Sequence, residues 1–178
     1  MWKKLFEIVR IDPDLEYLML DSSVVRAHAC AAGHGKSNQE KEALCRSKGG
    51  FTTKVHAAVD VLGNPLKFSL TGGKRHGITQ AQFLTGEFIG EFVLANKGYD
   101  SNAFIERLNA KGSIPVISSR KNRKELRGYD EFLYEDRSRI ECFFNKIKHH
   151  RRIFSRYDKC AQSFLTILYF VGALIWLR

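Results

Sequence analysis

The sequence has few cysteines, and none of them forms a pair at metal-binding or redox spacing. Its four cysteines are scattered over 178 residues without a Cys-x-x-Cys motif. Such usage is typical of reduced thiols in a cytosolic protein and argues against a disulfide framework. His28, Cys30, His34 and Cys45 do lie close together in a polar segment. Their spacing matches no regular zinc pattern, so we interpret their proximity as coincidence.

A long uninterrupted apolar segment is also missing. Residues 1–17 lack the apolar core of a secretory signal peptide. The most apolar run, residues 164–177, contains Thr166 and Gly172 and is shorter than the stretch of about 20 apolar residues that spans a membrane. We therefore expect a buried terminal helix and no membrane partner. Internal repeats and low-complexity tracts are absent from the sequence as well.

Acidic residues are outnumbered by basic ones. The chain has 29 Lys and Arg against 19 Asp and Glu, which gives a formal net charge of +10. This excess favours a polyanionic partner, nucleic acid before membrane. A hydrophobic content of 44% and an aromatic content of 12% are those of a globular protein. The length fits one domain over residues 1–178.

The basic residues gather in four segments, at residues 36–48, 74–76, 120–127 and 146–152. A single run of positive charge is by default a solvated surface. Lys and Arg make most phosphate contacts, which carry no sequence information. Four such segments on a chain of this charge favour a nucleic-acid interface.

Hydrophobic periodicity predicts an α/β domain. The expected order is three antiparallel strands followed by alternating helices and strands, as in a mixed sheet with helices against its faces. Residues 27–50, which are small, polar and glycine-rich, are predicted to form a long mobile loop. Strands are expected at residues 16–21, 51–60, 66–70, 91–95 and 113–117. Helices are expected at residues 1–10, 79–88, 101–110 (with Ser101 as N-cap), 134–148 and from about residue 159.

Two polar residues, His56 and Asp60, alternate with apolar ones in the strand expected at residues 51–60. The alternation predicts that they face solvent. Because polar residues on the open side of a strand need no function, a direct role in chemistry is the weaker interpretation.

The segment from Tyr134 to Lys148 places charges of both signs on one side of its predicted helix. At about 100° per residue, with Tyr134 as zero, Arg137, Glu141 and Lys148 project at about 300°, 340° and 320°. A carboxylate flanked by cations at the margin of an apolar face is well placed to hold a metal ion against a phosphate. The alternative is a solvated face with ordinary i, i+4 pairing, which we would favour for an isolated helix.

Two further segments accompany this one. The strand expected at residues 16–21 ends at Asp21, and the strand expected at residues 91–95 is followed by Asn96. Two-metal phosphodiester chemistry needs carboxylates fixed on rigid elements, and strand ends and a helix are such elements. A strand-end aspartate that caps a turn is common in any fold, so Asp21 alone would carry no argument.

Together these segments resemble bacterial insertion-sequence transposases of the DDE superfamily. The Tyr134-x-x-Arg137-x-x-x-Glu141-x-x-x-x-x-x-Lys148 spacing is complete and is the most diagnostic match. Residues 20–28 and 95–101 resemble the segments of the first and second catalytic aspartates, and the similarity runs from about residue 15 to the end. The resemblance implies an α/β, ribonuclease-H-like mixed sheet flanked by helices.

The resemblance also implies roles for individual residues. The catalytic and metal-binding set would be Asp21, Asn96 and Glu141. The DNA-binding set would be Arg137, Lys148, Arg151 and Arg152, with Tyr134 in support, and Arg137 and Lys148 could alternatively orient Glu141. Two Mg²⁺ ions, with Mn²⁺ as a substitute, are the implied cofactors. Double-stranded DNA is the implied partner, beside a homodimer or an upstream polypeptide, in the bacterial cytoplasm at the nucleoid.

Two departures from the family pattern affect what we expect. Asn96 stands where the family has its second catalytic aspartate, and an amide offers one neutral oxygen that cannot bridge two cations. Metal affinity is therefore expected to fall, and Asp100, four residues on, is not expected to replace the missing acid. In addition, few residues precede Asp21, where the family carries a region that recognises the element's ends. We therefore expect a fragment, a second reading frame of a split gene, or a truncated copy.

Three functions follow from these expectations. The first is a transposase catalytic domain that cleaves and transfers DNA strands at insertion-sequence ends, impaired by Asn96. The second is a catalytically silent DNA-binding remnant or a regulator of transposition. The third is a structure-specific nuclease on the same fold, which would cleave without joining strands.

Overall fold

The computed structural model describes residues 1–31 and 42–178, and a seven-stranded mixed sheet lies at the centre of these residues. β1 pairs antiparallel with β3 and parallel with β5, and β5 pairs parallel with β6. The opposite edge of β3 pairs with β4 and then with β2. The strands are β1 Tyr17–Ala27, β2 Cys45–Ser47, β3 Gly50–Val59, β4 Pro65–Gly72, β5 Phe92–Ala95, β6 Ile114–Ile117 and β7 Ser155–Arg156.

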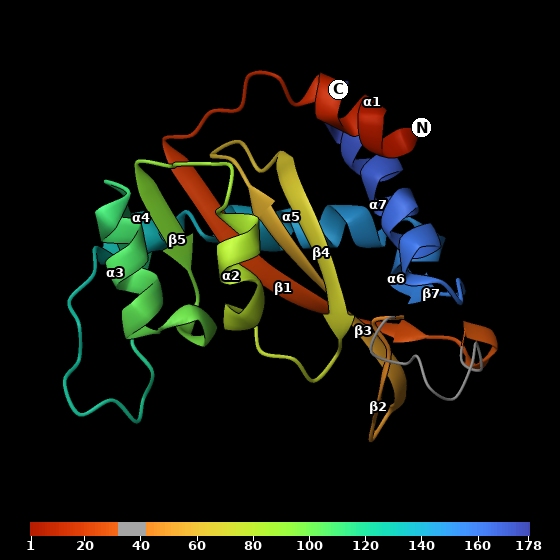
Figure 1. The fold of residues 1–178 in the computed structure, drawn as a ribbon, viewed down its shortest axis with the longest axis horizontal. Coiled ribbons are helices and arrows are strands. Elements are labelled where there is room, and N and C mark those ends of the chain that lie inside the picture. Colours follow the sequence, from red (N-terminus) through yellow and green to blue (C-terminus); the bar gives the residue numbers. More distant parts are fainter. Residues whose placement is uncertain (32–41) are drawn as a thin grey trace.

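Helices cover both faces of this sheet (Figure 1). On one face, apolar side chains of α1, α5 and α7 form a cluster with β1, β3 and β4. On the other face, α2 and α3 pack over β1, β5 and β6. The helices are α1 Trp2–Val9, α2 Ile78–Leu84, α3 Asn102–Ala110, α4 Glu131–Glu135, α5 Ser138–Lys148, α6 Arg151–Phe154 and α7 Ala161–Trp176, with short 3₁₀ turns η1 Ala29–Ala31 and η2 Lys97–Tyr99. Within the described ranges, none of these helices is both long and apolar enough to cross a membrane.

One edge of β1 is shared between two other strands. β5 pairs with its first part, from Tyr17 to Leu20, and β7 pairs with Arg26 and Ala27 at its far end. The predicted strand at residues 16–21 is therefore too short, because antiparallel pairing with β3 continues as far as Arg26. Asp21 lies inside β1, at the position where β5 ends.

The exposure expected for His56 of β3 and for Asp60, the residue that follows β3, is wrong. His56 and Asp60 are both fully buried. His56 shares a hydrogen bond of 2.8 Å between its Nε2 and Thr71 Oγ1. The Asp60 carboxylate accepts hydrogen bonds from the backbone N–H groups of Leu62 and Asn64, and so closes the turn between β3 and β4. The alternation of polar and apolar residues gave the wrong prediction because helices cover both faces of β3.

The predicted helix over residues 134–148 is also wrong in one respect. The structure divides it into α4 and α5 at Asp136 and Arg137. Across this break the backbone makes tight i→i−3 hydrogen bonds, including Arg137 N to Tyr134 O (3.1 Å) and Ile140 N to Arg137 O (3.2 Å). Arg137 consequently stands at the N-cap position of α5 instead of within a helix.

The predicted loop at residues 27–50 contains η1 and β2, and its part at residues 32–41 lies outside the described residues. A second feature that the sequence did not predict is β7, which carries the fully buried Arg156. The guanidinium of Arg156 donates hydrogen bonds to the carbonyl oxygens of Glu42, Asp158 and Lys159 and to Thr53 Oγ1. This side chain fastens the segment before α7 to the sheet.

Candidate active site

Asp21 and Asn96 lie side by side because their strands are parallel neighbours. The register pairs Leu20 with Ala95, so the next residue of each strand occupies the same level. The Asn96 side-chain Nδ2 donates a hydrogen bond of 2.7 Å to Asp21 Oδ1. The sheet therefore brings together the first and second positions predicted for the catalytic set.

Two partners fix the orientation of the Asn96 amide. Its Oδ1 accepts a hydrogen bond of 2.8 Å from the backbone N–H of Gly98. A flipped amide would set an oxygen against the Asp21 carboxylate and an N–H₂ against an N–H donor, and both contacts would be lost. Gly98 suits this close approach, because a Cβ there would lie 2.8 Å from Asn96 Oδ1. Asn96 thus presents its N–H₂ group to Asp21 and turns its oxygen away.

Arg137 connects Asp21 with the third predicted position. One terminal nitrogen, Nη1, donates to Asp21 Oδ2 over 3.0 Å, and the other, Nη2, donates to Glu141 Oε1. Glu141 lies one turn further along α5, with its side chain 55% exposed, whereas the Arg137 side chain is 17% exposed. The two carboxylates therefore face one shared cationic group, although they come from distant parts of the chain.

Tyr134 supports the Arg137 side chain from α4. The Arg137 guanidinium carbon lies 5.4 Å from the centre of the Tyr134 ring, within the range of a cation–π contact. The Tyr134 hydroxyl is 3.1 Å from Ser118 Oγ, just after β6, and its ring packs edge-on against Tyr129. The break between α4 and α5 allows the tyrosine and the arginine to meet in this way.

Burial dominates the electrostatics of Asp21. Removal from water raises the pKa of this carboxyl above its ordinary value, and the nearby charge of Glu141 acts in the same direction. The backbone N–H of Ser22 and the charges of Arg137 and Lys54 lower the pKa without outweighing burial. Additional positive charge beside Asp21 would therefore stabilise its ionised form.

The other predicted DNA-binding residues lie further along the chain than Glu141, on α5 and α6. Lys148 is half-buried at the end of α5, about 10 Å along the helix from Glu141 at 1.5 Å per residue. Arg151 and Arg152 are exposed at the start of α6, and Arg152 forms an ion pair of 2.7 Å with Asp158. These cations stand at the end of α5 and the start of α6 and do not converge on Asp21.

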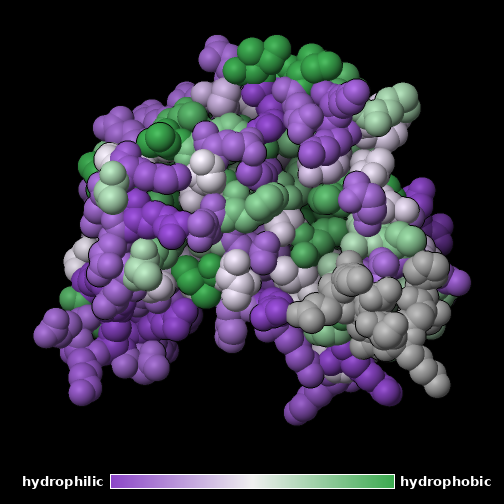
Figure 2. All heavy atoms as spheres, viewed as in Figure 1, coloured by the Kyte–Doolittle hydropathy of each residue, from purple (hydrophilic) through white to green (hydrophobic). Residues whose placement is uncertain are grey.

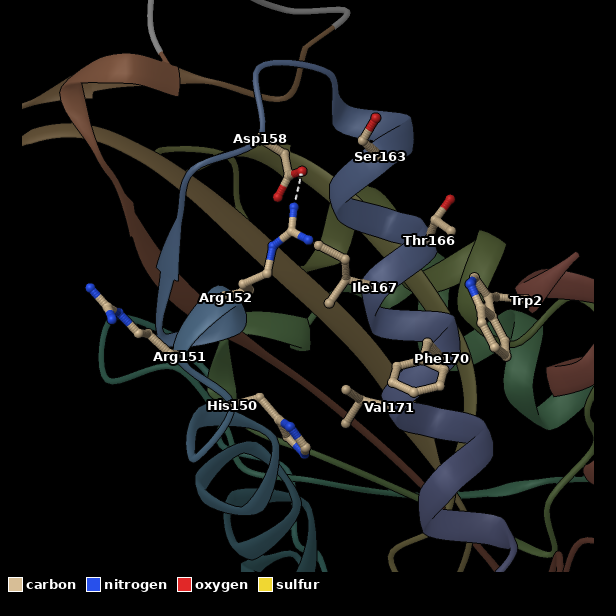
Figure 3. A pocket seen from close by; sticks show the side chains of 10 residues that line it. All are labelled: Trp2, His150, Arg151, Arg152, Asp158, Ser163, Thr166, Ile167, Phe170 and Val171. Atoms are coloured by element: carbon tan, nitrogen blue, oxygen red, sulfur yellow. Dashed lines mark hydrogen bonds and ion pairs between the residues drawn. The ribbon is translucent and has the colours of Figure 1, made fainter.

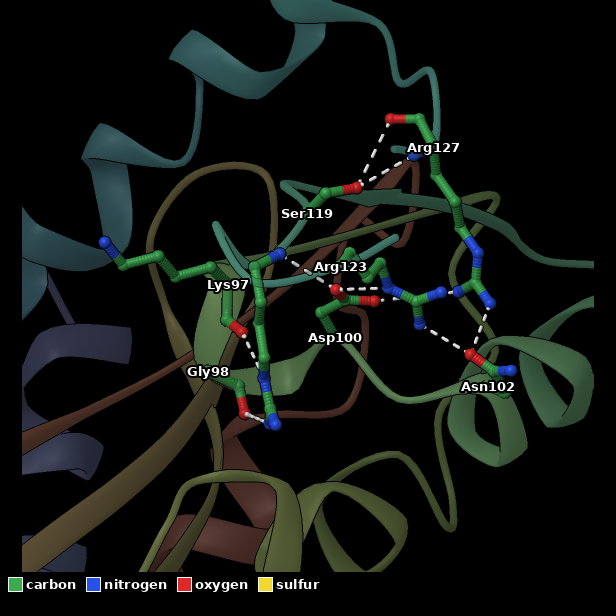
Figure 4. A network of polar contacts seen from close by, with 8 residues as sticks. Lys97, Gly98, Asp100, Asn102, Ser119, Arg123 and Arg127 are labelled. Atoms are coloured by element: carbon green, nitrogen blue, oxygen red, sulfur yellow. Dashed lines mark hydrogen bonds and ion pairs between the residues drawn. The ribbon is translucent and has the colours of Figure 1, made fainter. Parts of the chain in front are cut away.

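Asp100 anchors the basic loop after β6, a role that the sequence analysis missed (Figure 4). Its carboxylate accepts hydrogen bonds from the backbone N–H of Arg120 (2.9 Å) and from Arg123 Nε (2.7 Å), and Arg127 lies 3.7 Å away. Arg123 and Arg127 also donate to Asn102 Oδ1. As expected, Asp100 does not replace the missing acid at Asn96. The sequence signal for this role was the acidic Asp100 together with the run of Lys and Arg at residues 120–127.

This loop forms a hydrophilic part of the surface. Figure 2 shows hydrophilic residues gathered at the lower left, where the chain after β6 lies in Figure 1.

Burial alone would raise the pKa of Asp100. The hydrogen bonds from Arg123 and Arg120 and the charges of Arg123 and Arg127 outweigh it, so the pKa lies below its ordinary value.

The alternative metal cluster near residue 30 finds no support where the structure can be described. His28 Nδ1 lies 3.1 Å from Cys30 Sγ, whereas Cys45 Sγ accepts a hydrogen bond from the backbone N–H of Lys74. His34 lies outside the described residues. Among residues 1–31 and 42–178, no group of three or more His, Cys, Asp or Glu side chains is arranged to hold a metal ion.

Comparison with known proteins decides the family. Residues 13–176 match the sequence model of the transposase DDE domain. The chain belongs to this DDE transposase family. A putative transposase for insertion sequence element IS6501 from Brucella ovis is 39% identical over 133 residues, which cover 72% of this chain and 100% of that protein. The predicted insertion-sequence transposase family is thereby confirmed.

A solved structure supports the fold of this DDE domain. The cryo-EM structure of the piggyBac transposase synaptic complex with hairpin DNA matches 93% of the chain with a TM-score of 0.56. The identity is 10%, so this likeness shows the fold alone, and it agrees with the predicted ribonuclease-H-like mixed sheet. The chain spans less than half of the solved one, 46% of its length. The catalytic roles of Asp21, Asn96 and Glu141 in this DDE transposase stay predictions.

Proposed function

We propose that this chain is a transposase catalytic domain that cleaves DNA strands at the ends of an insertion sequence and joins them to target DNA. The observation that carries the proposal is the shared contact of Asp21 and Glu141 with Arg137. Arg137 thus contacts two acids that are far apart in the sequence, and Asn96 is hydrogen-bonded to one of them, Asp21. The family, the net charge of +10 and the basic segments support DNA as the partner.

The residues present fit a divalent cation held by Asp21 and Glu141. Both carboxylates already turn an oxygen toward one positive group, and carboxylate oxygens are the ligands that Mg²⁺ prefers. The raised pKa of Asp21 shows that its present partners do not fully compensate burial of its charge. When bound, such an ion supplies an activated water nucleophile and stabilises charge on the phosphate oxygens.

Asn96 fits the same ion poorly. Its oxygen is engaged by the Gly98 N–H, and its N–H₂ group faces the carboxylate that would bind the metal. A ligand role for Asn96 requires rotation of the amide and loss of both hydrogen bonds. The proposal of two Mg²⁺ ions, or Mn²⁺ in their place, therefore depends on that rotation.

The remaining side chains of the proposed site would bind and orient the DNA. Arg137 can exchange its contact with Asp21 for a DNA phosphate while Tyr134 holds its guanidinium in place. Lys148, Arg151 and Arg152 would contact phosphates along the α5–α6 side. Each phosphate contact releases counterions, so affinity for DNA should fall steeply with salt.

Cleavage and joining of an oligonucleotide that carries the element's terminal repeat tests the proposal, in Mg²⁺ and in Mn²⁺. Nicked and joined products are expected, and Glu141→Gln should lower their rate at least about 100-fold. Glu135→Gln is the matched control, because Glu135 is exposed on α4. Activity that survives Glu141→Gln would contradict the role of Glu141. Cleavage without joining would favour the structure-specific nuclease.

The hydrogen bond from Asn96 to Asp21 favours a second candidate, a DNA-binding remnant or regulator without chemistry. This candidate predicts salt-dependent DNA binding and no nicking by the natural chain. Restored nicking in Asn96→Asp would show that the site is intact except for the missing acid at position 96. Binding without nicking in both forms would favour the second candidate over the first. Sedimentation with and without DNA would test the homodimer.

A further inference from the structure

Two exposed arginines of the chain differ in what their guanidinium groups contact. Arg152 lines a cavity of about 630 Å³ between α1, α6 and α7, where it forms an ion pair of 2.7 Å with an aspartate (Figure 3). Arg120, in the loop after β6, instead donates to backbone oxygens of η2, from Nε to Lys97 O (3.2 Å) and from Nη2 to Gly98 O (3.3 Å). Asn96 is the N-cap residue of η2. Arg120 therefore contacts the turn that begins at a residue of the candidate active site.

One peptide group links Arg120 to Asn96. The carbonyl of Lys97 and the N–H of Gly98 belong to the same planar peptide unit. Arg120 and the backbone N–H of Asp100 (3.3 Å) both donate to the carbonyl of this unit. The N–H at its other end donates to Asn96 Oδ1 over 2.8 Å. The orientation of this one unit therefore decides whether the Asn96 oxygen has a donor, and Arg120 helps to fix that orientation.

The loop after β6 holds the backbone of Arg120 and leaves its side chain exposed. The backbone N–H donates to Asp100 Oδ2 over 2.9 Å, and this buried carboxylate also accepts from Arg123 (Figure 4). The Arg120 guanidinium, in contrast, binds two neutral carbonyl groups at an exposed position. A phosphate is a stronger partner than two carbonyls, because both sides of the contact are then charged and the guanidinium fork matches its oxygens.

The peptide unit between Lys97 and Gly98 is able to turn over. Such a rotation changes ψ of Lys97 and φ of Gly98, and glycine populates positive and negative φ about equally well. The turned unit points its carbonyl at position 96 instead of its N–H. The Asn96 amide would then donate its N–H₂ to that carbonyl and direct its oxygen toward Asp21, which is the orientation that a metal ligand needs.

We propose that Arg120 is a positioning residue, which keeps the Asn96 oxygen turned away from Asp21 until a DNA phosphate binds the Arg120 guanidinium. The inference rests on the proposed function, because it takes DNA as the partner and a divalent cation as the ligand of Asp21. It adds a link between the basic loop after β6 and the metal site. DNA bound at this loop releases the peptide unit, so the Asn96 oxygen becomes available where the cation binds.

Nuclear magnetic resonance of the full chain in EDTA follows the Asn96 side-chain amide directly. Its N–H signals are identified by their loss in Asn96→Asp. They should broaden in Arg120→Ala, because the amide then exchanges between two orientations. Lys121→Ala is the matched control, since it removes the same charge from an exposed position of the same loop. It should leave the Asn96 signals unchanged.

Calorimetric titration with Mg²⁺ gives a second measurement. Arg120→Ala should bind Mg²⁺ about tenfold more tightly than the natural chain, because less of the binding energy is needed to turn the Asn96 amide. Lys121→Ala separates this gain from the simple loss of a positive charge. Arg120→Lys, whose ammonium can still donate to Lys97 O, should give an intermediate affinity.

A short blunt DNA duplex added to the natural chain tests the release. It should broaden the Asn96 signals relative to those of Asn109, which is exposed on α3. In Arg120→Ala, where the amide already exchanges, the duplex should add little to this difference. DNA that binds the natural chain and leaves the Asn96 signals unchanged relative to Asn109 overturns the release by DNA.

The remaining outcomes separate this inference from the proposed function. Unchanged Asn96 signals in Arg120→Ala overturn the positioning role, and so does an equal change in Lys121→Ala. Weaker Mg²⁺ binding by Arg120→Ala also overturns it, because the residue would then only stabilise the site. A chain that binds neither Mg²⁺ nor DNA contradicts the proposed function and the release by DNA. Broadened Asn96 signals of Arg120→Ala in EDTA would still support the positioning role in that case.

Discussion

The side-chain amide of Asn96 donates a hydrogen bond of 2.7 Å to the Asp21 carboxylate. A neutral donor thus stands against a buried acid, where an aspartate would place a second negative charge. With Arg137 on its other oxygen, Asp21 is satisfied by protein groups on both sides. These two donors offset part of the cost of burying the Asp21 charge.

Replacement of Asn96 by aspartate should reverse this balance. Two carboxylates at hydrogen-bonding distance repel each other, and the donor to Asp21 is lost. We expect Asn96→Asp to lower the free energy of unfolding by about 1–3 kcal/mol in EDTA. Mg²⁺ should restore much of that loss, because a bound cation stabilises the folded state by mass action. Urea denaturation with and without Mg²⁺ measures both effects.

Asn109→Asp is the matched control for this charge change, because Asn109 is exposed on α3. It should leave stability nearly unchanged and confer no response to Mg²⁺. An Asn96→Asp protein that is as stable as the natural chain in EDTA would contradict the role assigned to the amide. An equal Mg²⁺ response in the natural chain would show that Asn96 does not limit metal binding.

Arg137→Lys tests whether the forked guanidinium is required. A lysine ammonium carries the same charge but cannot span two carboxylates in one plane as Arg137 does. We expect a loss of about 1–2 kcal/mol in the free energy of unfolding. Arg107→Lys, an exposed position on α3, should have no measurable effect in the same thermal denaturation experiment. Equal melting temperatures for both variants would show that one contact of Arg137 suffices.

Asp100→Asn should release the basic loop after β6. The Asp100 side chain is 1% exposed and holds Arg123 and the backbone of Arg120. Removal of its charge leaves Arg123 without its anion, at a cost of about 1–3 kcal/mol. Trypsin should then cleave within residues 120–127 faster than in the natural chain. Asp136→Asn removes a more exposed ion pair and should not accelerate cleavage.

Sequence reasoning could predict the adjacency of Asp21 and Asn96, because each directly follows an apolar run that is typical of a buried strand in a parallel pair. It could not predict which way the Asn96 amide turns, because that depends on Gly98. The break at Asp136 was equally hidden, since the helical pattern continues through it. Arg156 shows the general limit. Its partner Glu42 is far away in the sequence, so only the tertiary structure shows why an arginine can be buried.

His56 illustrates the same limit and gives a pH-dependent prediction. It lies opposite Ser22 on β1, next to Asp21, and is 0% exposed. Burial lowers the pKa of His56 from 6.5 to about 4, and the charge of Lys54 acts in the same direction. Above pH 6.5 the imidazole is neutral in both folded and unfolded chains, so it contributes no pH dependence there.

Between pH 6.5 and 4, only the unfolded chain takes up a proton at His56, so stability should fall as the pH falls. The full loss is about 3 kcal/mol, at 1.36 kcal/mol for each pKa unit, and is complete near pH 4. Urea denaturation at pH 7, 6 and 5 measures it. His56→Gln should flatten this slope, whereas His76→Gln, at an exposed position, should retain it. An unchanged slope in His56→Gln would mean that other groups control the acid sensitivity.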